Sequence, residues 1–568
     1  MTGPAAPVTE QDPEPGRPLR HQVSRGIGRA ALLIGALTAA ARVIGFGRQL
    51  VFAHTVQNSC LGSAYTTANQ VPNIIYDIVL GGALASIMVP VLAGPAERSR
   101  ADPDAARTTS QISSALLTWT VVLLVPATVI LGLVAGPVIS LLIPHLQGCA
   151  RPDAVAVGSR MLEVFAPQIL LYGLAVVLYG ILQAHRKFTG PALAPVLSSL
   201  VVIAAYIAFV PLGGAHTTDL AGLPVSAELM LSVGTTVGVA ALLVTALVPA
   251  FRLRLRVRPS LRFPPGVARR ARSLATVGIA ALIAQDVSVV VVTRLANGHG
   301  GSGAVVLYNY AWQMFLVPYA VLAIPIAVSA FPVLSARAGT ESGRGGPARA
   351  ETDRAEFDAT SAASTRGVLL VSWLGAALLA GAAVPAARLF ASYPGQVTQL
   401  AWAFVAFAPG LVGYGLVACL SRVLLADSRN RAAAVAMAGG WLIVIVADVI
   451  AVELVPARWV VPVLGLGNTV GMVLSGAALL IAVRRARGSG ALHGTARAAA
   501  AGLAGALAGA AAGAGLSAAL PVTGFFLNAI IALLACCCAV IGFGVVAFFL
   551  DGGDLRAVLS RVLRRAAT

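Results

Sequence analysis

Long apolar segments alternate with short polar ones along almost the whole chain. We count fourteen apolar segments of about 20 residues or more, the length that an α-helix needs to cross the hydrocarbon core of a bilayer. Only helices and closed barrels satisfy the backbone hydrogen bonds in lipid, and segments of this length favour helices. The pattern therefore predicts an all-α polytopic membrane protein. The predicted spans are 29–53, 63–94, 110–143, 158–184, 191–211, 228–250, 271–296, 303–333, 366–390, 397–426, 431–455, 459–483, 497–520 and 523–550.

Composition excludes the main alternative class. A chain of 568 residues would suggest several soluble domains, but 58% of its residues are hydrophobic and only 11% are charged. Its mean hydropathy of +0.85 is far above that of an ordinary soluble protein. No signal peptide precedes the first span, and residues 1–28, which are Pro-rich and basic, are expected to form a disordered cytoplasmic tail.

The net charge of +18 is placed asymmetrically. Most of the 40 Arg and Lys residues fall on one side of the predicted spans, whereas the loops of the opposite side hold only Arg151 and Arg458. This asymmetry predicts a topology with both termini in the cytoplasm. The densest run, Arg252–Phe263, is typical of anchoring against anionic lipid headgroups, although a specific ligand site is the alternative.

The basic loop at 251–270 falls at the middle of the first twelve spans and is expected to link two lobes. A repeat of six spans returns the chain to the same side, so the N-lobe (29–250) and the C-lobe (271–485) should be parallel copies. Little sequence identity between the halves is evident. Between the eighth and ninth spans, Ala336–Arg366 is rich in Arg, Glu, Gly and Ser and is expected to be flexible.

The last two spans, within 497–550, are rich in Ala and Gly, a composition that suits close helix packing. Residues 551–568 would follow as a second cytoplasmic tail.

The first predicted span carries two arginines, Arg42 and Arg48, where a lipid-buried helix should have no charge. An ionisable residue within a membrane is costly and by default indicates a function. Six residues place the two side chains about 120° apart on an ideal helix, so a shared cavity would need distortion. Gly45 and Gly47 would allow a bend there. The alternative is that Arg48 reaches the outer headgroups along its apolar stem.

Two other spans are unusually polar. The second holds Asn69, Gln70, Pro72 and Asn73, and the eighth opens with a polar and aromatic run that includes Gln313. Such residues are typical of a broken helix that lines a cavity, although Asn and Gln also form hydrogen bonds between packed helices.

No nucleotide-binding loop, metal cluster or Ser/His/Asp group stands out, so the sequence does not predict an enzyme, and uphill work would have to come from a gradient. Fixed positive charge inside a bundle would instead suit a pyrophosphate-linked lipid headgroup, because guanidinium groups match phosphate oxygens bidentately.

Several motifs occur in an order that resembles one family. The first span reads small-R-x-x-G-F-x-R over Ala41–Arg48, and the second enters through Pro72 and Asn73. These features resemble the MurJ/MviN lipid II flippases of the multidrug/oligosaccharidyl-lipid/polysaccharide exporter superfamily. The likeness covers roughly residues 28 to 485. Further segments that carry it are Gly82–Leu84, Val89–Leu92, Leu182–Pro195, Tyr308–Pro318 and Phe331–Ser335.

The resemblance implies a substrate site. Arg42 and Arg48 match the family arginines that bind the lipid II diphosphate, and Asn73 and Gln313 would contact its sugar or peptide. Arg294 could replace a positive charge that the second half lacks, and the last two spans would form a groove for the lipid tail. The chain departs from the family pattern at Ser63, Tyr76, Asp77, Gly81 and Gln313.

The resemblance also implies an ion site, because some members bind Na⁺ between their seventh, eleventh and twelfth helices. Hard oxygen ligands suit such a cation. Asp448 could instead be a neutral structural residue, and Na⁺, H⁺ and the membrane potential remain open as drivers. The candidates for ion coupling are Asp286, Ser288, Asp448, Asn468 and Thr469.

Cys60 and Cys149 both fall in short loops on the predicted outer, oxidising side, which makes a disulfide between them a candidate. Sequence alone does not show whether these loops meet.

We expect the chain to move lipid II from the inner to the outer leaflet of the bacterial cytoplasmic membrane by alternating access. One alternative is transport of another polyprenyl-linked glycan. Another is a membrane scaffold that recruits cell-wall synthesis proteins without transport, which should tolerate loss of the buried arginines.

Overall fold

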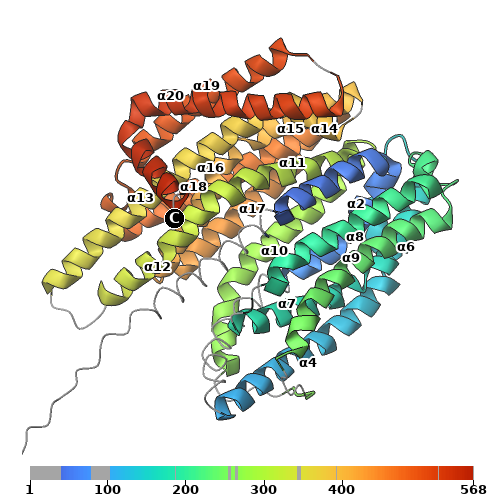
Figure 1. The fold of residues 1–568 in the computed structure, drawn as a ribbon, viewed down its shortest axis with the longest axis horizontal. Coiled ribbons are helices and arrows are strands. Elements are labelled where there is room, and N and C mark those ends of the chain that lie inside the picture. Colours follow the sequence, from blue (N-terminus) through green and yellow to red (C-terminus); the bar gives the residue numbers. More distant parts are fainter. Residues whose placement is uncertain are drawn as a thin grey trace, which may run out of the picture.

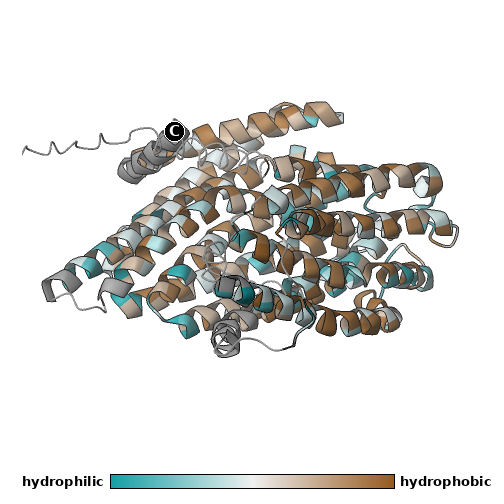
Figure 2. Ribbon diagram, turned by 60° about the horizontal axis from the view of Figure 1, so that its bottom comes forward, coloured by the Kyte–Doolittle hydropathy of each residue, from teal (hydrophilic) through white to brown (hydrophobic). Residues whose placement is uncertain are grey.

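The structure is a computed structural model that describes residues 37, 40–78, 103–185, 187, 189–253, 258–261, 267–341, 347–391, 393–521 and 523–566. Within these residues all regular structure is helical. Eleven helices are long and apolar enough to cross a membrane, or twelve when the bent pair α15 (Pro394–Phe407) and α16 (Gly410–Ala426) counts as one span. The twelve correspond to predicted spans three to fourteen, which confirms the all-α polytopic fold. Figure 2 shows apolar residues along most of the length of these helices.

The first two predicted spans extend into residues outside the described part, as do the tail at 1–28 and most of the basic run Arg252–Phe263. Residues 40–55 form a helix, and α2 follows it. The helices of the first half are α2 (Cys60–Asp77), α4 (Pro103–Leu133), α5 (Ala135–Leu142), α6 (Arg151–Phe165), α7 (Gln168–Ala184), α8 (Thr189–Gly213), η2 (Gly214–His216) and α9 (Val225–Phe251).

The second half continues the series to the end of the chain. Its elements are α10 (Val267–His299), α11 (Ala304–Pro318), η3 (Tyr319–Ala323), α12 (Ile324–Glu341), α13 (Pro347–Gly381), α14 (Ala383–Phe390), α15, α16, α17 (Asn430–Val452), η4 (Ala457–Trp459), α18 (Val460–Arg487), η5 (Gly490–Leu492), α19 (Thr495–Ala519) and α20 (Phe525–Ala566).

The helices of the two halves lie in two groups (Figure 1). Helices α4 and α6 to α9 lie together in blue and green, and helices α13 to α18 lie on the other side in yellow and orange. Helix α2 joins the groups, because it packs against α6 and α7 of the first half and against α10 and α11 of the second. Helices α19 and α20 pack against each other and against α13 on the outside of the second group.

Two spans in each half are broken at corresponding places. Helix α4 runs through Pro126 and ends at Leu133, and Val134 separates it from the short helix α5. In the second half α13 ends before Ala382, and the equally short α14 follows. The first of these breaks falls between Gly132 and Gly136, where helix propensity is low.

The next span of each half breaks at the same three residues. Phe165-Ala166-Pro167 separates α6 from α7, and Phe407-Ala408-Pro409 separates α15 from α16, with a bend of 41° at the second break. Proline lacks the N–H that would continue the helix, which accounts for both breaks. Five residues after each proline the chain reads Tyr-Gly, at Tyr172 and at Tyr414.

The eighth predicted span is also interrupted. Helix α11 ends at Pro318, and the π-helical turn η3 separates it from α12. The N–H of Ile324 donates to the carbonyl of Tyr319, five residues earlier, which is the spacing of a π-helix. The extra residue of this turn rotates the side chains of α12 about the helix axis relative to those of α11.

The expectation of a flexible Ala336–Arg366 segment was wrong for the residues that the structure describes. Helix α12 extends to Glu341 and α13 begins at Pro347. Arg337 forms an ion pair of 3.1 Å with the buried Asp353, and Phe357 is fully buried with the guanidinium of Arg487 3.9 Å above its ring. Ala-rich stretches favour helix, and these contacts hold the charged residues in place.

Candidate functional site

A polar cavity of about 190 Å³ lies between the two groups of helices. Its walls come from the helix at 40–55 and from α2, α7, α8, α9 and α11. Both halves of the chain therefore contribute. The lining residues are Arg48, Gln49, Phe52, Tyr65, Thr66, Asn69, Gln70, Asn73, Tyr172, Ser198, Val202, Tyr206, Thr235, Val239, Val306, Asn309, Tyr310 and Gln313.

Arg48 is the only charged residue among the described residues of this lining. Several tyrosines share the wall with it, and the hydroxyl of Tyr65 lies 2.9 Å from that of Tyr206 and 2.6 Å from Oγ1 of Thr235. These hydroxyls satisfy one another without a carboxylate. The cavity consequently carries net positive charge, which is what an anionic group would need.

Amide side chains form part of the cavity wall. Asn73 donates to the carbonyl of Asn69 at 2.9 Å, and Gln313 donates to Oδ1 of Asn309 at 3.2 Å. The buried Oδ1 of Asn69 has no hydrogen-bond partner within the described residues. Asn73, Gln313 and Arg48, three of the predicted substrate-binding residues, thus line one cavity, to which the two amides contribute hydrogen-bond donors and acceptors.

The other two predicted substrate-binding residues lie elsewhere. The helix continues without a break through Gly45 and Gly47, and it does not turn both arginines into the cavity. Arg42 is exposed and does not line the cavity. Arg294 is exposed near the C-terminal end of α10 and donates to the carbonyl of Leu141.

Two of the positions that depart from the family pattern have other contacts. Tyr76 packs on Tyr172 with ring centroids 4.5 Å apart, and Asp77 is exposed. Gly81 lies outside the described residues.

The candidate ion-coupling residues lie on α10, α17 and α18, which pack against one another. Asp448 and Asn468 are fully buried, Asp286 and Ser288 are almost fully buried, and Thr469 donates to the carbonyl of Ala406 at 2.6 Å. The carboxylate of Asp448 lies so close to Gly467 that a Cβ there would be 1.9 Å from its Oδ1.

Several polar atoms of this group lack a hydrogen-bond partner in the described part of the chain. They are both carboxylate oxygens of Asp448, both amide atoms of Asn468 and Oδ2 of Asp286. A buried carboxylate without a partner is costly unless it takes a proton or a cation. Carboxylate and amide oxygens are the donors that a small hard cation prefers, so the residues fit such a role.

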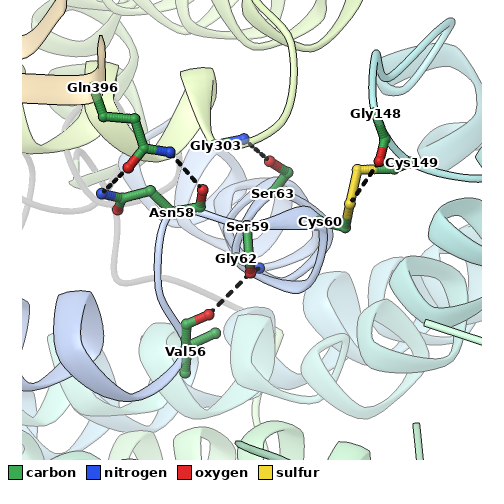
Figure 3. The surroundings of a disulfide bond; sticks show 10 residues. All are labelled: Val56, Asn58, Ser59, Cys60, Gly62, Ser63, Gly148, Cys149, Gly303 and Gln396. Carbon is green, nitrogen blue, oxygen red and sulfur yellow. Dashed lines mark hydrogen bonds between the residues drawn. A yellow bond between two sulfur atoms is a disulfide. The ribbon is translucent and has the colours of Figure 1, made fainter. Parts of the chain in front are cut away.

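Cys60 and Cys149 are joined by a disulfide, with their Cα atoms 5.8 Å apart. The bond links the first residue of α2 to the loop before α6 (Figure 3). We call this end of the bundle the disulfide end.

Hydrogen bonds join the two halves at the disulfide end (Figure 3). Asn58 donates to the carbonyl of Phe390 at 2.8 Å, and Gln396 donates to the carbonyl of Asn58 at 3.0 Å. The buried Ser63 accepts from the N–H of Gly303 at 2.8 Å. We call the contacts of Asn58 and Ser63 the latch. Next to them, Asn297 donates to Thr67 at 2.8 Å.

Sequence reasoning missed the latch. It identified Ser63 only as a departure from the family pattern and gave Asn58 and Gln396 no role. The available signal was weak, because polar residues at span ends are common in loops.

A bundle of membrane-crossing helices that encloses a positively charged polar cavity between two halves, closed at one end by contacts between them, has the architecture of a membrane transporter. The family follows from the comparison of sequences. The model of the family described as lipid II flippase MurJ matches residues 52–533, and the chain belongs to this family.

Curated relatives carry the same description. The chain is 25% identical over 400 residues to the lipid II flippase MurJ of Burkholderia cenocepacia, which covers 69% of this chain and 72% of that protein. It is 30% identical over 248 residues to a probable lipid II flippase MurJ of Synechocystis sp., which covers 42% of this chain and 44% of the relative.

Solved structures support the fold. A lipid II flippase MurJ in an inward closed conformation superposes with a TM-score of 0.67 at 16% identity, covering 91% of this chain and 99% of that one. An inward-facing transporter of the multidrug resistance MATE family, of the MOP superfamily, superposes with a TM-score of 0.59 at 15% identity, covering 80% and 94%. At these identities the likeness concerns the fold alone.

Proposed function

We propose that this protein flips lipid II, the lipid-linked peptidoglycan precursor, from the inner to the outer leaflet of the cytoplasmic membrane. The observation that carries the proposal is the cavity in which Arg48 is the one charged residue among the described lining residues. A guanidinium in a low-dielectric site suits a diphosphate, because its planar donors match phosphate oxygens bidentately. The amides of Asn73 and Gln313 would contact the sugar or peptide.

We further propose that the chain works as two parallel lobes, 29–250 and 271–485, joined by the linker at 251–270. The matching breaks support this division, since Phe-Ala-Pro separates α6 from α7 and also α15 from α16. Helices α19 and α20, which lie outside the second lobe against α13, would provide the groove for the lipid tail.

The orientation that we propose has both termini, including the tails 1–28 and 551–568, in the cytoplasm and the disulfide end facing outward. A disulfide persists on the oxidising side of the membrane, and the inward placement of Arg and Lys agrees with this direction. In this orientation the latch closes the outer side of the cavity. Opening the latch would then release the headgroup outward, which is the second half of an alternating-access cycle.

The buried group of Asp286, Ser288, Asp448, Asn468 and Thr469 is our candidate for ion coupling. Binding of Na⁺ or H⁺ there would neutralise the negative charge of the buried carboxylates. A gradient of the ion, or the membrane potential acting on Arg48, would then bias the cycle in one direction.

The decisive test is complementation of cells depleted of their native lipid II flippase, at matched membrane expression. Wild type should restore growth and lipid II in the outer leaflet, whereas Arg48→Ala should restore neither. Arg458→Ala, which removes an exposed arginine outside the cavity, is the matched control.

Three outcomes would count against the proposal. Failure of the well-inserted wild type would remove lipid II as the substrate and favour another polyprenyl-linked glycan. Rescue of growth by Arg48→Ala with normal outer-leaflet lipid II would overturn the assigned site. Rescue of growth without any lipid II movement would favour a scaffold that recruits cell-wall synthesis proteins.

A further inference from the structure

A second and larger cavity, of about 690 Å³, lies at the disulfide end, apart from the cavity that holds Arg48. It is enclosed by α14, α15, the turn between α19 and α20, and the end of the helix at 40–55. Its volume is in the range of sites that hold small ligands. The lining residues are His54, Val384, Arg388, Leu389, Ala391, Pro394, Val397, Thr398, Ala401, Trp402, Pro521, Thr523, Gly524, Phe525 and Asn528.

The lining is positively charged. Arg388, in the last turn of α14, is half-buried and donates to Oδ1 of the buried Asn528 at 3.5 Å. His54 lies on the same wall, and its Nδ1 is 2.8 Å from the carbonyl of Leu50, which leaves Nε2 as its second polar atom. No Asp or Glu is among the described residues of the lining. An anion that entered would therefore meet positive charge and, among the described lining residues, no carboxylate.

Two helix N-termini reinforce this charge. Pro394 and Phe525, the first residues of α15 and α20, both line the cavity. The N-terminus of a helix carries a partial positive charge and unpaired N–H groups, which favour phosphate. An arginine, a histidine and two helix N-termini thus surround the same space.

The position of Arg388 in the membrane adds a second, independent argument. Arginines of this chain are concentrated at the opposite end of the bundle, so a positive charge at the disulfide end departs from the general pattern. The exposed rings of Trp402 and Phe525 flank the cavity, and Trp402 is of the residue type that lies at the level of lipid headgroups.

We propose that this cavity, which we call the outer pocket, binds the phosphate of an anionic lipid headgroup in the outer leaflet. Arg388 and His54 would contact the phosphate oxygens, while Trp402 and Phe525 would pack on the glycerol and upper acyl carbons. The site depends on the proposed orientation but not on the flipping of lipid II, which uses the other cavity. Inorganic phosphate shares the same chemistry and is the alternative source of the anion.

The test is lipid retention by the purified full-length protein, counted by native mass spectrometry during titration with short-chain phosphatidylglycerol. All variants are made in an Arg48→Gln background, so that lipid binding in the cavity lined by Arg48 does not contribute. Arg388→Gln should raise the apparent Kd about tenfold, the size expected from loss of one charge-assisted interaction. Arg458→Gln is the matched control, because Arg458 is exposed at the same end and does not line the pocket.

His54→Gln provides a second variant that leaves the contact between Arg388 and Asn528 in place, and it should give a smaller loss in the same direction. Titration with inorganic phosphate alone separates the sources. Binding of phosphate that depends on Arg388, without binding of the lipid, would assign the pocket to free phosphate. Equal lipid binding by the Arg48→Gln parent and by the variant that adds Arg388→Gln, or an equal loss on adding Arg458→Gln, would overturn the proposal.

Discussion

Asn58 and Gln396 form a reciprocal hydrogen-bonded pair across the two halves of the chain, although 338 positions separate them in the sequence. Nδ2 of Asn58 donates to Oε1 of Gln396 at 3.3 Å, and Nε2 of Gln396 donates to the carbonyl of Asn58 at 3.0 Å. Figure 3 shows the pair beside the disulfide. Because these bonds join the two halves at the disulfide end, their loss should shift the balance between the closed and open states.

Gln396→Ala should favour opening of the disulfide end. Loss of both bonds of Gln396 removes about 1–2 kcal/mol, which changes a two-state population about five- to thirtyfold. An added Thr66→Cys substitution, in the wall of the cavity that holds Arg48, would report opening through the rate at which a membrane-impermeant thiol reagent labels it. Thr398→Ala, on the same helix, is the control, because the hydroxyl of Thr398 donates to the carbonyl of Pro394 within its own helix and to no residue of the first half that the structure describes. Equal labelling of the two variants would remove Gln396 from the latch.

The disulfide should stabilise the first half of the chain. Its sequence separation of 89 residues corresponds to about 4.6 kcal/mol in a chain-entropy treatment of the unfolded state. The Cys60→Ser/Cys149→Ser variant should therefore unfold at a lower temperature, and wild type should approach it when reductant is added. The variant itself should not respond to reductant, which controls for other effects. If free thiols at Cys60 and Cys149 were labelled in native membranes without prior reduction, the bond would not exist there.

Hydropathy predicted the spans well because lipid leaves a chain few choices. A long apolar segment in a bilayer must satisfy its own backbone, so composition alone determines that it is helical. Arg48, Asn73 and Gln313 could be found for a related reason, since polar residues within apolar spans are costly unless they face a cavity.

The remaining features depend on contacts that periodicity does not encode. Nothing local to Asn58 indicates that its partner is Gln396. The two Phe-Ala-Pro segments are visible in the sequence. The structure adds that each of them breaks a helix, at Pro167 and at Pro409, in matching places of the two halves. The glycines near Arg48 permit a bend without requiring one, and the helix remains continuous there.

The three predicted arginines should differ in their contributions to transport. Only Arg48 lines the cavity, so Arg48→Ala should lower outer-leaflet lipid II at least about tenfold, as expected from loss of a partly desolvated charge pair. Arg48→Lys should retain part of the activity, since it keeps the charge but loses the planar donors. Arg42→Ala and Arg294→Ala should have smaller effects, because both side chains are exposed. A loss for Arg42→Ala equal to that for Arg48→Ala would mean that Arg42 enters the cavity in another state.

The buried carboxylate of Asp448 leads to a prediction that separates ion binding from a structural role. If Na⁺ binds there, it stabilises the folded protein by mass action, so the unfolding temperature of wild type should rise when choline chloride is replaced by NaCl. Asp448→Asn keeps the shape of the side chain and removes the charge, so its unfolding temperature should not respond to Na⁺. The variant should be at least as stable as wild type in choline chloride, because it no longer buries an unpaired charge.

Glu453→Gln is the control, because Glu453 lies on the same chain segment just after α17 but is exposed. A Na⁺ response retained by Asp448→Asn would exclude this carboxylate as a ligand. Absence of a response in wild type, together with higher stability of Asp448→Asn, would favour H⁺ as the coupling ion.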